Sequence, residues 1–324
     1  MRRLTYQQAI KEALTQLMQE DERVVLLGQG LDSPWSFGDT TLGLIHRFGK
    51  KRVFDIPISE NGMTGVAIGA AMTGLRPILM HPRVDFMYLT MDQIVNHAAN
   101  WRAMFGGRVN VPVVIRGVVN RGNEQAAQHS QSPHAMFAHV PGLKVVMPAS
   151  PADAKGLLVS AVRDPDPVIY IDDRWLYSLE GEVPESMEPT PIGLGRRVRQ
   201  GKDLTVVAIS YTVPRAERAA ERLESEGISV DLLDPRTIKP LDIDLIVDSV
   251  KTTGRLLVID SGWTSFGVSG EVIAAVVERA FDRLKAPPHR LASPDTPVPA
   301  SCTLERAFYL DEERIVEAMR KALE

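Results

Sequence analysis

The sequence predicts an α/β protein built from two doubly wound domains. Short apolar runs that suit buried strands alternate with segments whose apolar residues recur at helical spacing, and this alternation stops once and then restarts. Continuous apolar strands separated by helices are typical of a parallel sheet that is covered on both faces. The chain has 324 residues, which is long enough for two such domains.

The first half of the chain opens with a helix. Thr5 and Gln8 have the spacing of a capping box, and the apolar residues after them recur on one helical face. Ser150-Pro151 predicts the start of a later helix, because a proline at the first helical position needs no amide donor. We expect the strands of this half at residues 24–27, 111–115, 145–147 and 168–171.

A change in composition separates the two halves. Residues 178–203 are rich in proline, glycine and charge, and have little periodicity. We predict a first domain over 1–185, a linker over 186–202 with room for an edge strand, and a second domain over 203–324. We interpret the basic run Arg196–Arg199 in the linker as a solvated loop face.

The second half repeats the alternation of strands and helices. Its strands are apolar and short, and its last segment has the pattern of an amphipathic helix. We expect strands at 204–209, 228–233 and 256–259, and helices at 215–226, 243–250, 270–284 and from 312 onward.

Composition excludes several classes of function. The formal net charge of -4 argues against a protein that coats nucleic acid or an anionic membrane. A single cysteine, Cys302, excludes an internal disulfide and suits a reducing compartment. The opening residues do not read as a secretory signal, and no apolar run is long enough to cross a bilayer. We therefore expect a cytoplasmic protein with neither nucleic acid nor membrane as a partner.

Glu60 is the first candidate for chemistry. It lies between a short strand and a helix that begins near Asn61 and consists almost entirely of small or apolar residues. A carboxylate is stable at the positive end of a helix, so a capping residue would occupy the same position. Gly65 and Gly69, one turn apart, let another backbone approach this helix closely. Spacing alone leaves both a catalytic and a capping role open for Glu60.

Phe86 and His129 are the other candidates. Phe86 could offer a flat ring to a heterocycle, although its surroundings also suit a core residue. His129 lies in a polar loop after a predicted strand, where the active sites of open α/β sheets usually lie, but a solvated loop histidine has the same pattern. His134 and His139 follow it, and the three histidines fit no zinc pattern because no cysteine or paired carboxylate accompanies them.

A site for phosphate is absent from the sequence. The chain contains no GxxxxGK[ST], no GxGxxG after a strand and no GxSxG. Gly38-Asp39-Thr40 is not followed by the glycine and the distant asparagine of a diphosphate–magnesium motif. We therefore expect that the chain holds no phosphate by itself.

Together these segments resemble the beta subunit of the decarboxylating first component of 2-oxoacid dehydrogenase complexes, of the pyruvate, branched-chain or acetoin type. The resemblance covers nearly the whole chain and includes KRVFDIPISENGMTGVAIGAAMTGLRPI, QHSQS and VPGLKVVMPASPADAKGLL. It implies a transketolase-type pyrimidine-binding domain followed by a transketolase C-terminal domain. It also implies thiamine diphosphate as cofactor, β–β contact in an α₂β₂ assembly, and a lipoyl acyltransferase as acceptor. An alpha subunit would supply the diphosphate and Mg²⁺ site.

The resemblance also implies roles for single residues. Glu60 would hydrogen-bond the aminopyrimidine ring of the cofactor, so that the ring can take the thiazolium proton. Phe86 would stack on the same ring, and His129 would face the substrate carboxylate or the acyl-transfer step. A structural K⁺ site, built mainly from backbone carbonyls, would lie around Val113, Ala161, Val162, Asp164 and Asp166.

The chain departs from the family pattern at three places. Gln29 stands where many relatives have a glutamate, so a proton relay between paired sites is in doubt. Asp260-Ser261-Gly262 replaces a common Glu-Glu-Gly, and the segment His81–Asp85 also differs. Because these changes touch the pocket region, the 2-oxoacid and the acceptor stay open.

Three functions are compatible with this sequence. The first is the beta subunit of a 2-oxoacid dehydrogenase that transfers an acyl group to a lipoyl carrier. The second is a related two-subunit thiamine enzyme that uses an aldehyde acceptor, as transketolases and acyloin synthases do. The third is a non-catalytic partner-binding subunit, against which the joint presence of Glu60, Phe86 and His129 argues.

Overall fold

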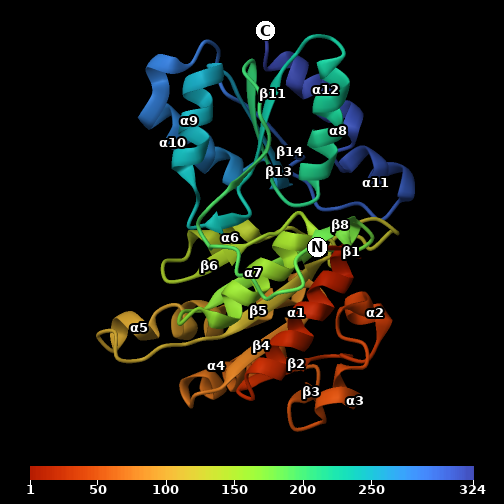
Figure 1. Ribbon diagram of the computed structural model, residues 1–324, viewed down its shortest axis with the longest axis vertical. Helices are drawn as coiled ribbons and strands as arrows, with labels where there is room; N and C mark the ends of the chain where they lie inside the picture. Colours follow the sequence, from red (N-terminus) through yellow and green to blue (C-terminus); the bar gives the residue numbers. More distant parts are fainter. The chain divides into compact units, whose positions relative to one another are not determined.

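The protein divides into two compact units (Figure 1). The computed structural model describes all residues from Met1 to Glu324. The N-terminal unit comprises Met1–Arg121 and His129–Ile192, and the C-terminal unit comprises Gly122–Gln128 and Gly193–Glu324. The limits of the predicted linker stay a prediction.

A parallel sheet forms the centre of the N-terminal unit. Its strands follow the order β6-β7-β5-β4-β2-β3, and every pair among them is parallel, as the apolar runs predicted. A separate antiparallel pair of β1 (Arg2–Thr5) and β8 (Glu180–Val183) was not predicted. The sheet strands are β2 (Val24–Gly28), β3 (Val53–Asp55), β4 (Arg76–His81), β5 (Val114–Val119), β6 (Lys144–Val146) and β7 (Val168–Asp173).

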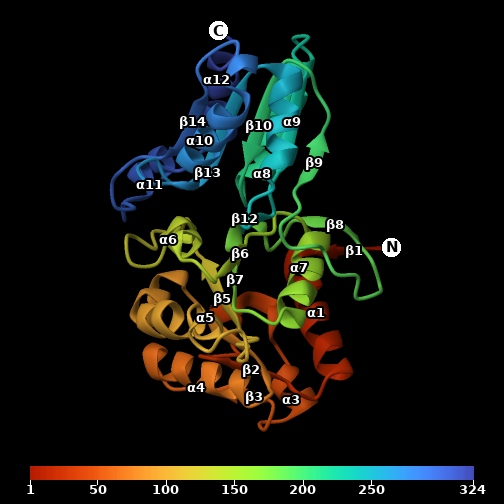
Figure 2. The same cartoon turned by 90° about the vertical axis from the view of Figure 1, so that its left-hand side faces the viewer.

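Helices cover both faces of this sheet, as Figure 2 shows. On one side α1 (Tyr6–Glu20) packs against α7 (Pro151–Arg163), and on the other α4 (Glu60–Met72) packs against η2 (Val84–Thr90) and η3 (Asp92–Ala98). The predicted caps are confirmed, because Thr5 and Gln8 form a capping box and Ser150 accepts the N–H of Asp153. The remaining short elements are α2 (Pro34–Phe37), η1 (Gly38–Thr40), α3 (Leu44–Phe48), α5 (Trp101–Met104), α6 (His134–His139) and η4 (Arg174–Leu176).

The C-terminal unit has the same layered construction. Its sheet has the order β14-β13-β10-β11-β9, in which only the edge strand β9 is antiparallel to its neighbour. Helices α8 and α12 pack together on one side of the sheet, and α9 and α10 on the other (Figure 1). The elements are β9 (Arg196–Arg199), β10 (Leu204–Ala208), α8 (Thr212–Glu224), β11 (Val230–Asp234), β12 (Thr237–Lys239), α9 (Ile243–Thr253), β13 (Leu256–Trp263), α10 (Val268–Ala280), η5 (Phe281–Arg283), β14 (His289–Ser293), α11 (Cys302–Phe308) and α12 (Glu312–Lys321).

The basic run in β9 corrects one interpretation of the sequence. Arg196–Arg199 is the edge strand of the C-terminal sheet and not a solvated loop. Arg197 Nε lies 2.9 Å from Oδ1 of Asp231, whose side chain is buried in the neighbouring strand. Arginine side chains on an edge strand also discourage pairing with a further strand, so the charge has a structural purpose here.

Candidate active site

The candidate residues follow the carboxyl ends of the parallel strands in the N-terminal unit. β2 ends at Gly28 and leads into Gln29, while the segment after β3 leads into Glu60 at the start of α4. β4 ends at His81, just before the η2 segment that contains Phe86. Since the carboxyl ends of parallel strands meet at one edge of a sheet, segments far apart in sequence converge there.

Glu60 is the first residue of α4 and is only 7% exposed. Its Oε1 accepts a hydrogen bond of 3.3 Å from Nε2 of Gln29, which leaves Oε2 for a ligand. The positive end of the helix stabilises the carboxylate. The position is therefore not a simple cap, since Glu60 is held by a side chain from another strand end.

Phe86 and His129 lie in contact. Their rings are edge to face, with centroids 5.6 Å apart and an interplanar angle of 85°. Both side chains are half-buried, so Phe86 is not sealed in the core and His129 is not a freely solvated loop residue. The η2 segment that contains Phe86 also packs against α4, the helix that Glu60 begins. The three residues singled out in the sequence thus belong to neighbouring elements of one unit.

The other two histidines of this region lie apart from that arrangement. His134 is buried at the start of α6 and His139 is exposed at its end. No group of three or more histidine, cysteine or acidic side chains in the protein could hold a metal ion.

His81 is a residue whose importance the sequence did not indicate. It is 2% exposed, and its Nε2 has no hydrogen-bond partner. His81 is the last residue of β4, and β4 is the parallel neighbour of β2, the strand that leads into Gln29. Burial lowers the pKa of His81 to about 4, and the charge of Glu60 opposes that shift. His81 is therefore neutral at pH 7 and lies close to Glu60.

His81 should make the protein less stable in acid. The imidazole titrates near 6.5 in the unfolded chain and near 4 in the folded one, so the unfolded state binds the proton first. The contribution of the neutral imidazole to the free energy of unfolding is therefore fully present above pH 6.5. It decreases by about 3 kcal/mol as the pH falls to 4. Urea unfolding of wild type and His81→Phe at pH 7 and at pH 4 would measure this. We expect the variant to lose about 3 kcal/mol less, and equal losses would contradict the assignment.

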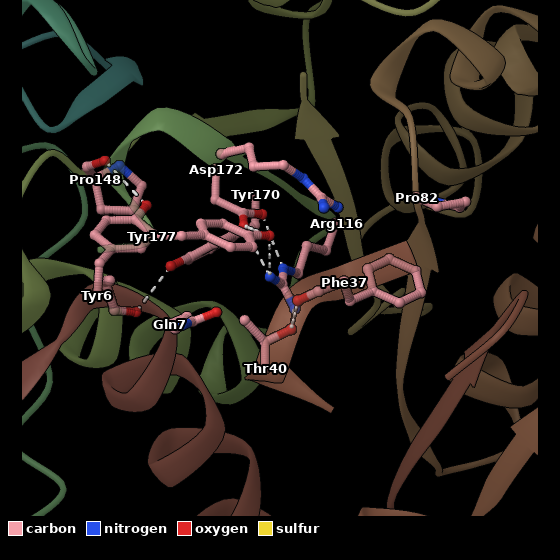
Figure 3. Close-up of polar contacts among 12 residues, drawn as sticks. Tyr6, Gln7, Phe37, Thr40, Pro82, Arg116, Pro148, Tyr170, Asp172 and Tyr177 are labelled. Atoms are coloured by element: carbon pink, nitrogen blue, oxygen red, sulfur yellow. Dashed lines mark hydrogen bonds and ion pairs between the residues drawn. The ribbon is translucent and has the colours of Figure 1, made fainter. Parts of the chain in front are cut away.

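A buried ion pair joins two central strands of the same sheet (Figure 3). Arg116 of β5 makes two hydrogen bonds of 2.8 Å to the carboxylate of Asp172 in β7, and both side chains are 0% exposed. The hydroxyl of Tyr177 donates to Asp172 at 2.7 Å and accepts from Arg116 at 3.2 Å. Burial, and then the charge of Asp172, raise the pKa of Tyr177, so its hydroxyl stays protonated as a donor.

This network holds the segment that follows Gln29. Arg116 donates to Oγ1 of Thr40 at 3.1 Å, and its guanidinium lies 5.8 Å from the ring centroid of Phe37. Arg174 adds a bond of 2.6 Å to the carbonyl of Ser36. Arg116 and Arg174 thus hold the segment Ser36–Thr40, which lies in the connection between β2 and β3 that begins at Gln29.

Comparison with known families identifies the two units. Residues 2–178 match the pyrimidine-binding domain of transketolase, and residues 193–315 match the transketolase C-terminal domain. The chain belongs to this transketolase-like family. The fold class predicted from the sequence, and the family that it resembled, are confirmed.

Known relatives are similar to this chain over almost its full length. It is 43% identical to the beta subunit of acetoin:2,6-dichlorophenolindophenol oxidoreductase of Cupriavidus necator, over 99% of this chain and 98% of that one. It is 40% identical to the beta subunit of the pyruvate dehydrogenase E1 component of Rickettsia bellii, over 98% of both. A solved structure described as a split gene transketolase, inactive beta4 tetramer, matches with a TM-score of 0.79 and 24% identity. That match covers 99% of this chain and 98% of the other and shows the fold alone.

Four of the five residues that the family resemblance links to K⁺ lie in the last turn of α7 or just after it, and the fifth, Val113, accepts the backbone N–H of Val168. Ala161 and Val162 lie in its last turn, Asp164 caps it, and Val113 precedes β5. Two cations of the protein lie at the same place. Arg76 Nη1 donates to the carbonyl of Val162 at 2.5 Å, and Lys144 Nζ lies 2.6 Å from Asp164. Asp166, the other carboxylate linked to K⁺, forms an ion pair in which its Oδ1 lies 2.6 Å from Nη1 of Arg102.

Proposed function

We propose that this protein is the beta subunit of a thiamine-diphosphate-dependent 2-oxoacid dehydrogenase. The observation that carries the proposal is the pairing of Glu60 with Gln29 at the start of α4, a helix that packs against the η2 segment in which Phe86 contacts His129. An almost buried carboxylate with one oxygen available suits a ring nitrogen, and an accessible aromatic ring suits a flat heterocycle. These residues therefore fit the pyrimidine half of the cofactor.

Each of these side chains has a distinct task in the proposal. Glu60 shares a proton with a nitrogen of the bound ring, which is general acid–base catalysis. Phe86 fixes the plane of the ring by stacking on it. His129 faces the carboxylate of the substrate or the acyl group in transfer, where a donor stabilises negative charge. The cofactor supplies a nucleophilic carbon and an electron sink when it is bound.

The proposal requires an alpha subunit, because this chain has no phosphate motif. The alpha subunit would hold the diphosphate and Mg²⁺ in an α₂β₂ assembly that also contains β–β contacts. Large apolar side chains near Glu60 are exposed, including Ile58 at 83% and Val66 at 54%. Exposed apolar residues beside a half-formed site are typical of a surface that a partner covers.

The isolated chain is therefore expected to bind the cofactor poorly. Without the phosphate site, the diphosphate has no counter-charge, and only ring contacts remain. Calorimetric titration of the purified chain with thiamine diphosphate and Mg²⁺ should give no Mg²⁺-dependent binding tighter than about 1 mM, or about -4 kcal/mol. The same titration of the reconstituted assembly is the positive control. Micromolar binding by the chain alone would contradict the division of the site.

The acceptor is a lipoyl group on an acyltransferase in this proposal. The test is to reconstitute the chain with its alpha subunit, supply 2-oxoacids, and measure CO₂ release and reductive acylation of a lipoyl domain. Acyloin formation with no reaction of the lipoyl domain would favour a transketolase or acyloin-synthase type of enzyme instead. An assembly that forms and binds the cofactor but releases no CO₂ would favour a non-catalytic subunit.

A structural K⁺ at the end of α7 is also part of the proposal. The carbonyl oxygens of the last helical turn and the carboxylates of Asp164 and Asp166 form a hard-oxygen environment. Arg76 and Lys144 already neutralise part of this charge, so we expect the ion to add little in wild type. Exchange of K⁺ for tetramethylammonium should lower the melting temperature by no more than about 4 °C, which is about 1 kcal/mol. The loss should be larger in Arg76→Met, and no effect in either protein would contradict the site.

We propose a cytoplasmic location for the assembly. No helix of the protein has both the length and the apolar character that crossing a bilayer requires. A similar protein of Arabidopsis thaliana, 39% identical over 98% of this chain and 89% of its own length, is described as mitochondrial. Fractionation of the source cells with an antibody to this chain would test the location.

A further inference from the structure

The loop before His129 has an unfavourable backbone. Asn123, Glu124 and Ala126 all have φ between 56 and 59°, in the left-handed region that favours glycine. Each such residue costs on the order of 1–3 kcal/mol unless its surroundings impose the conformation. The chain around His129 therefore needs fixed contacts on the far side of the histidine, if that side chain is to keep one position.

Asp85 provides such a contact. Its Oδ1 accepts the backbone N–H of Gln131, two residues after His129, at 3.0 Å. Asp85 is 5% exposed and immediately precedes Phe86, whose ring touches His129. The segment that supplies the aromatic neighbour of His129 is thus also the segment that holds the His129 backbone.

The second oxygen of the Asp85 carboxyl group, Oδ2, is buried without a hydrogen bond. Burial raises the pKa of Asp85, whereas the Gln131 hydrogen bond and the nearby His129 lower it. Burial of a carboxyl group without full pairing is costly, and such a cost is typical of functional sites.

We propose that Asp85 is a positioning residue for His129, which it holds against Phe86 by anchoring the loop at the Gln131 amide. The proposal rests on the proposed function, since it assigns His129 to the reaction. Asp85 itself need not touch the substrate. Arg121 holds the same loop one residue later, through a bond of 2.9 Å to Oγ of Ser132, so the anchor at Gln131 is the nearer of the two to the histidine.

The anchor can be measured without any reaction. Hydrogen–deuterium exchange of the assembled α–β complex with cofactor should show a protected amide in the peptide that contains Gln131. In Asp85→Leu this amide should exchange at least about tenfold faster, which corresponds to the loss of one hydrogen bond to a charged group. Asp85→Asn should recover the protection, because its Oδ1 still accepts the bond. Unchanged exchange in Asp85→Leu would overturn the proposal.

The effect of Asp85 on turnover is tested by a double-mutant cycle with His129. Asp85→Leu should lower kcat for 2-oxoacid turnover by about tenfold or more, in line with the loss of that hydrogen bond, and leave the KM for the cofactor within about twofold. In a His129→Ala background the same change should cost less than about twofold, since the histidine that it positions is gone. If Asp85→Leu lowers kcat by the same factor with and without His129, the proposal is overturned. It is also overturned if Asp85→Leu exchanges the Gln131 amide fast but keeps the wild-type kcat. Asp282→Leu, at a side chain 77% exposed, is the matched control for folding and assembly.

The two proposals fail in different ways. If the wild-type assembly turns over no 2-oxoacid, the proposed function fails, and the exchange measurement still decides whether Asp85 anchors the loop. If the wild-type assembly is active, and Asp85→Leu exchanges the Gln131 amide fast but keeps full activity, the proposed function stands and only the role of Asp85 is contradicted.

Discussion

Glu60→Gln is expected to lower kcat of the reconstituted enzyme by about 10²–10⁴-fold, the range of a lost general acid–base residue. The amide has the same shape and can keep a hydrogen bond to Gln29, but it cannot exchange a proton with the cofactor ring. Folding and assembly should be unchanged at pH 7, because the amide can keep the bond to Gln29 and His81, on which the charge of Glu60 also acts, is neutral there. Steady-state turnover, gel filtration with the alpha subunit and thermal melting would measure the three properties.

A matched control is available on the C-terminal unit. Glu317 is an exposed residue of α12, so Glu317→Gln makes the same chemical change far from any candidate residue in sequence. It should leave turnover within about twofold, as surface substitutions usually do. Wild-type turnover in Glu60→Gln would remove Glu60 from the reaction. It would also favour a subunit whose role is only to bind its partner.

The candidate residues could be selected from the sequence because their signals are local, and their roles stay predictions. Glu60 and Phe86 follow the ends of β3 and β4 closely, His129 lies in the loop after β5, and a parallel sheet brings such strand ends together. The contact of Phe86 with His129 follows from that topology. The spacing left open whether these residues were capping, core or solvated, because burial depends on neighbours that no local pattern contains.

Errors in the predicted elements have identifiable physical causes. The strand predicted at 111–115 is β5 at Val114–Val119, because Pro112 cannot donate to a sheet ladder and the pairing begins after it. The polar β1 and β8 pair with each other and not with a buried sheet, so neither has the apolar run of a buried strand. Arg196–Arg199 was assigned to a loop because an edge strand can be highly charged.

His81, Asp85 and Arg116 could not be predicted from sequence. Buried charged and polar residues have no periodic signature, and their partners are distant in the chain. Arg116 finds Asp172 because β5 and β7 are neighbours in the sheet, with Val118 paired to Asp172. The departures noted at Gln29 and at His81–Asp85 were the available signal, since Gln29 donates a hydrogen bond to Glu60 and the charge of Glu60 acts on His81.

Arg116→Met is expected to destabilise the N-terminal unit by about 3–5 kcal/mol, because it leaves the carboxylate of Asp172 buried without its counter-charge. Asp172 is 0% exposed and would keep the hydrogen bond from the hydroxyl of Tyr177, which cannot compensate a full charge. For a unit of this size, such a loss lowers the melting temperature by about 6–20 °C. Differential scanning calorimetry of the purified chain would measure it.

A triple variant that replaces the whole network with apolar residues distinguishes the cost of the unpaired charge from the cost of lost packing. Arg116→Met combined with Asp172→Leu and Tyr177→Phe removes all three polar partners together, and a buried ion pair replaced by apolar residues is often neutral or stabilising. Most of the lost melting temperature should therefore return in the triple variant. Cofactor affinity of the reconstituted enzyme should return less, because Thr40 then has no guanidinium to hold the loop after Gln29. If the triple variant melts as low as Arg116→Met, the loss comes from packing volume and not from the unpaired carboxylate.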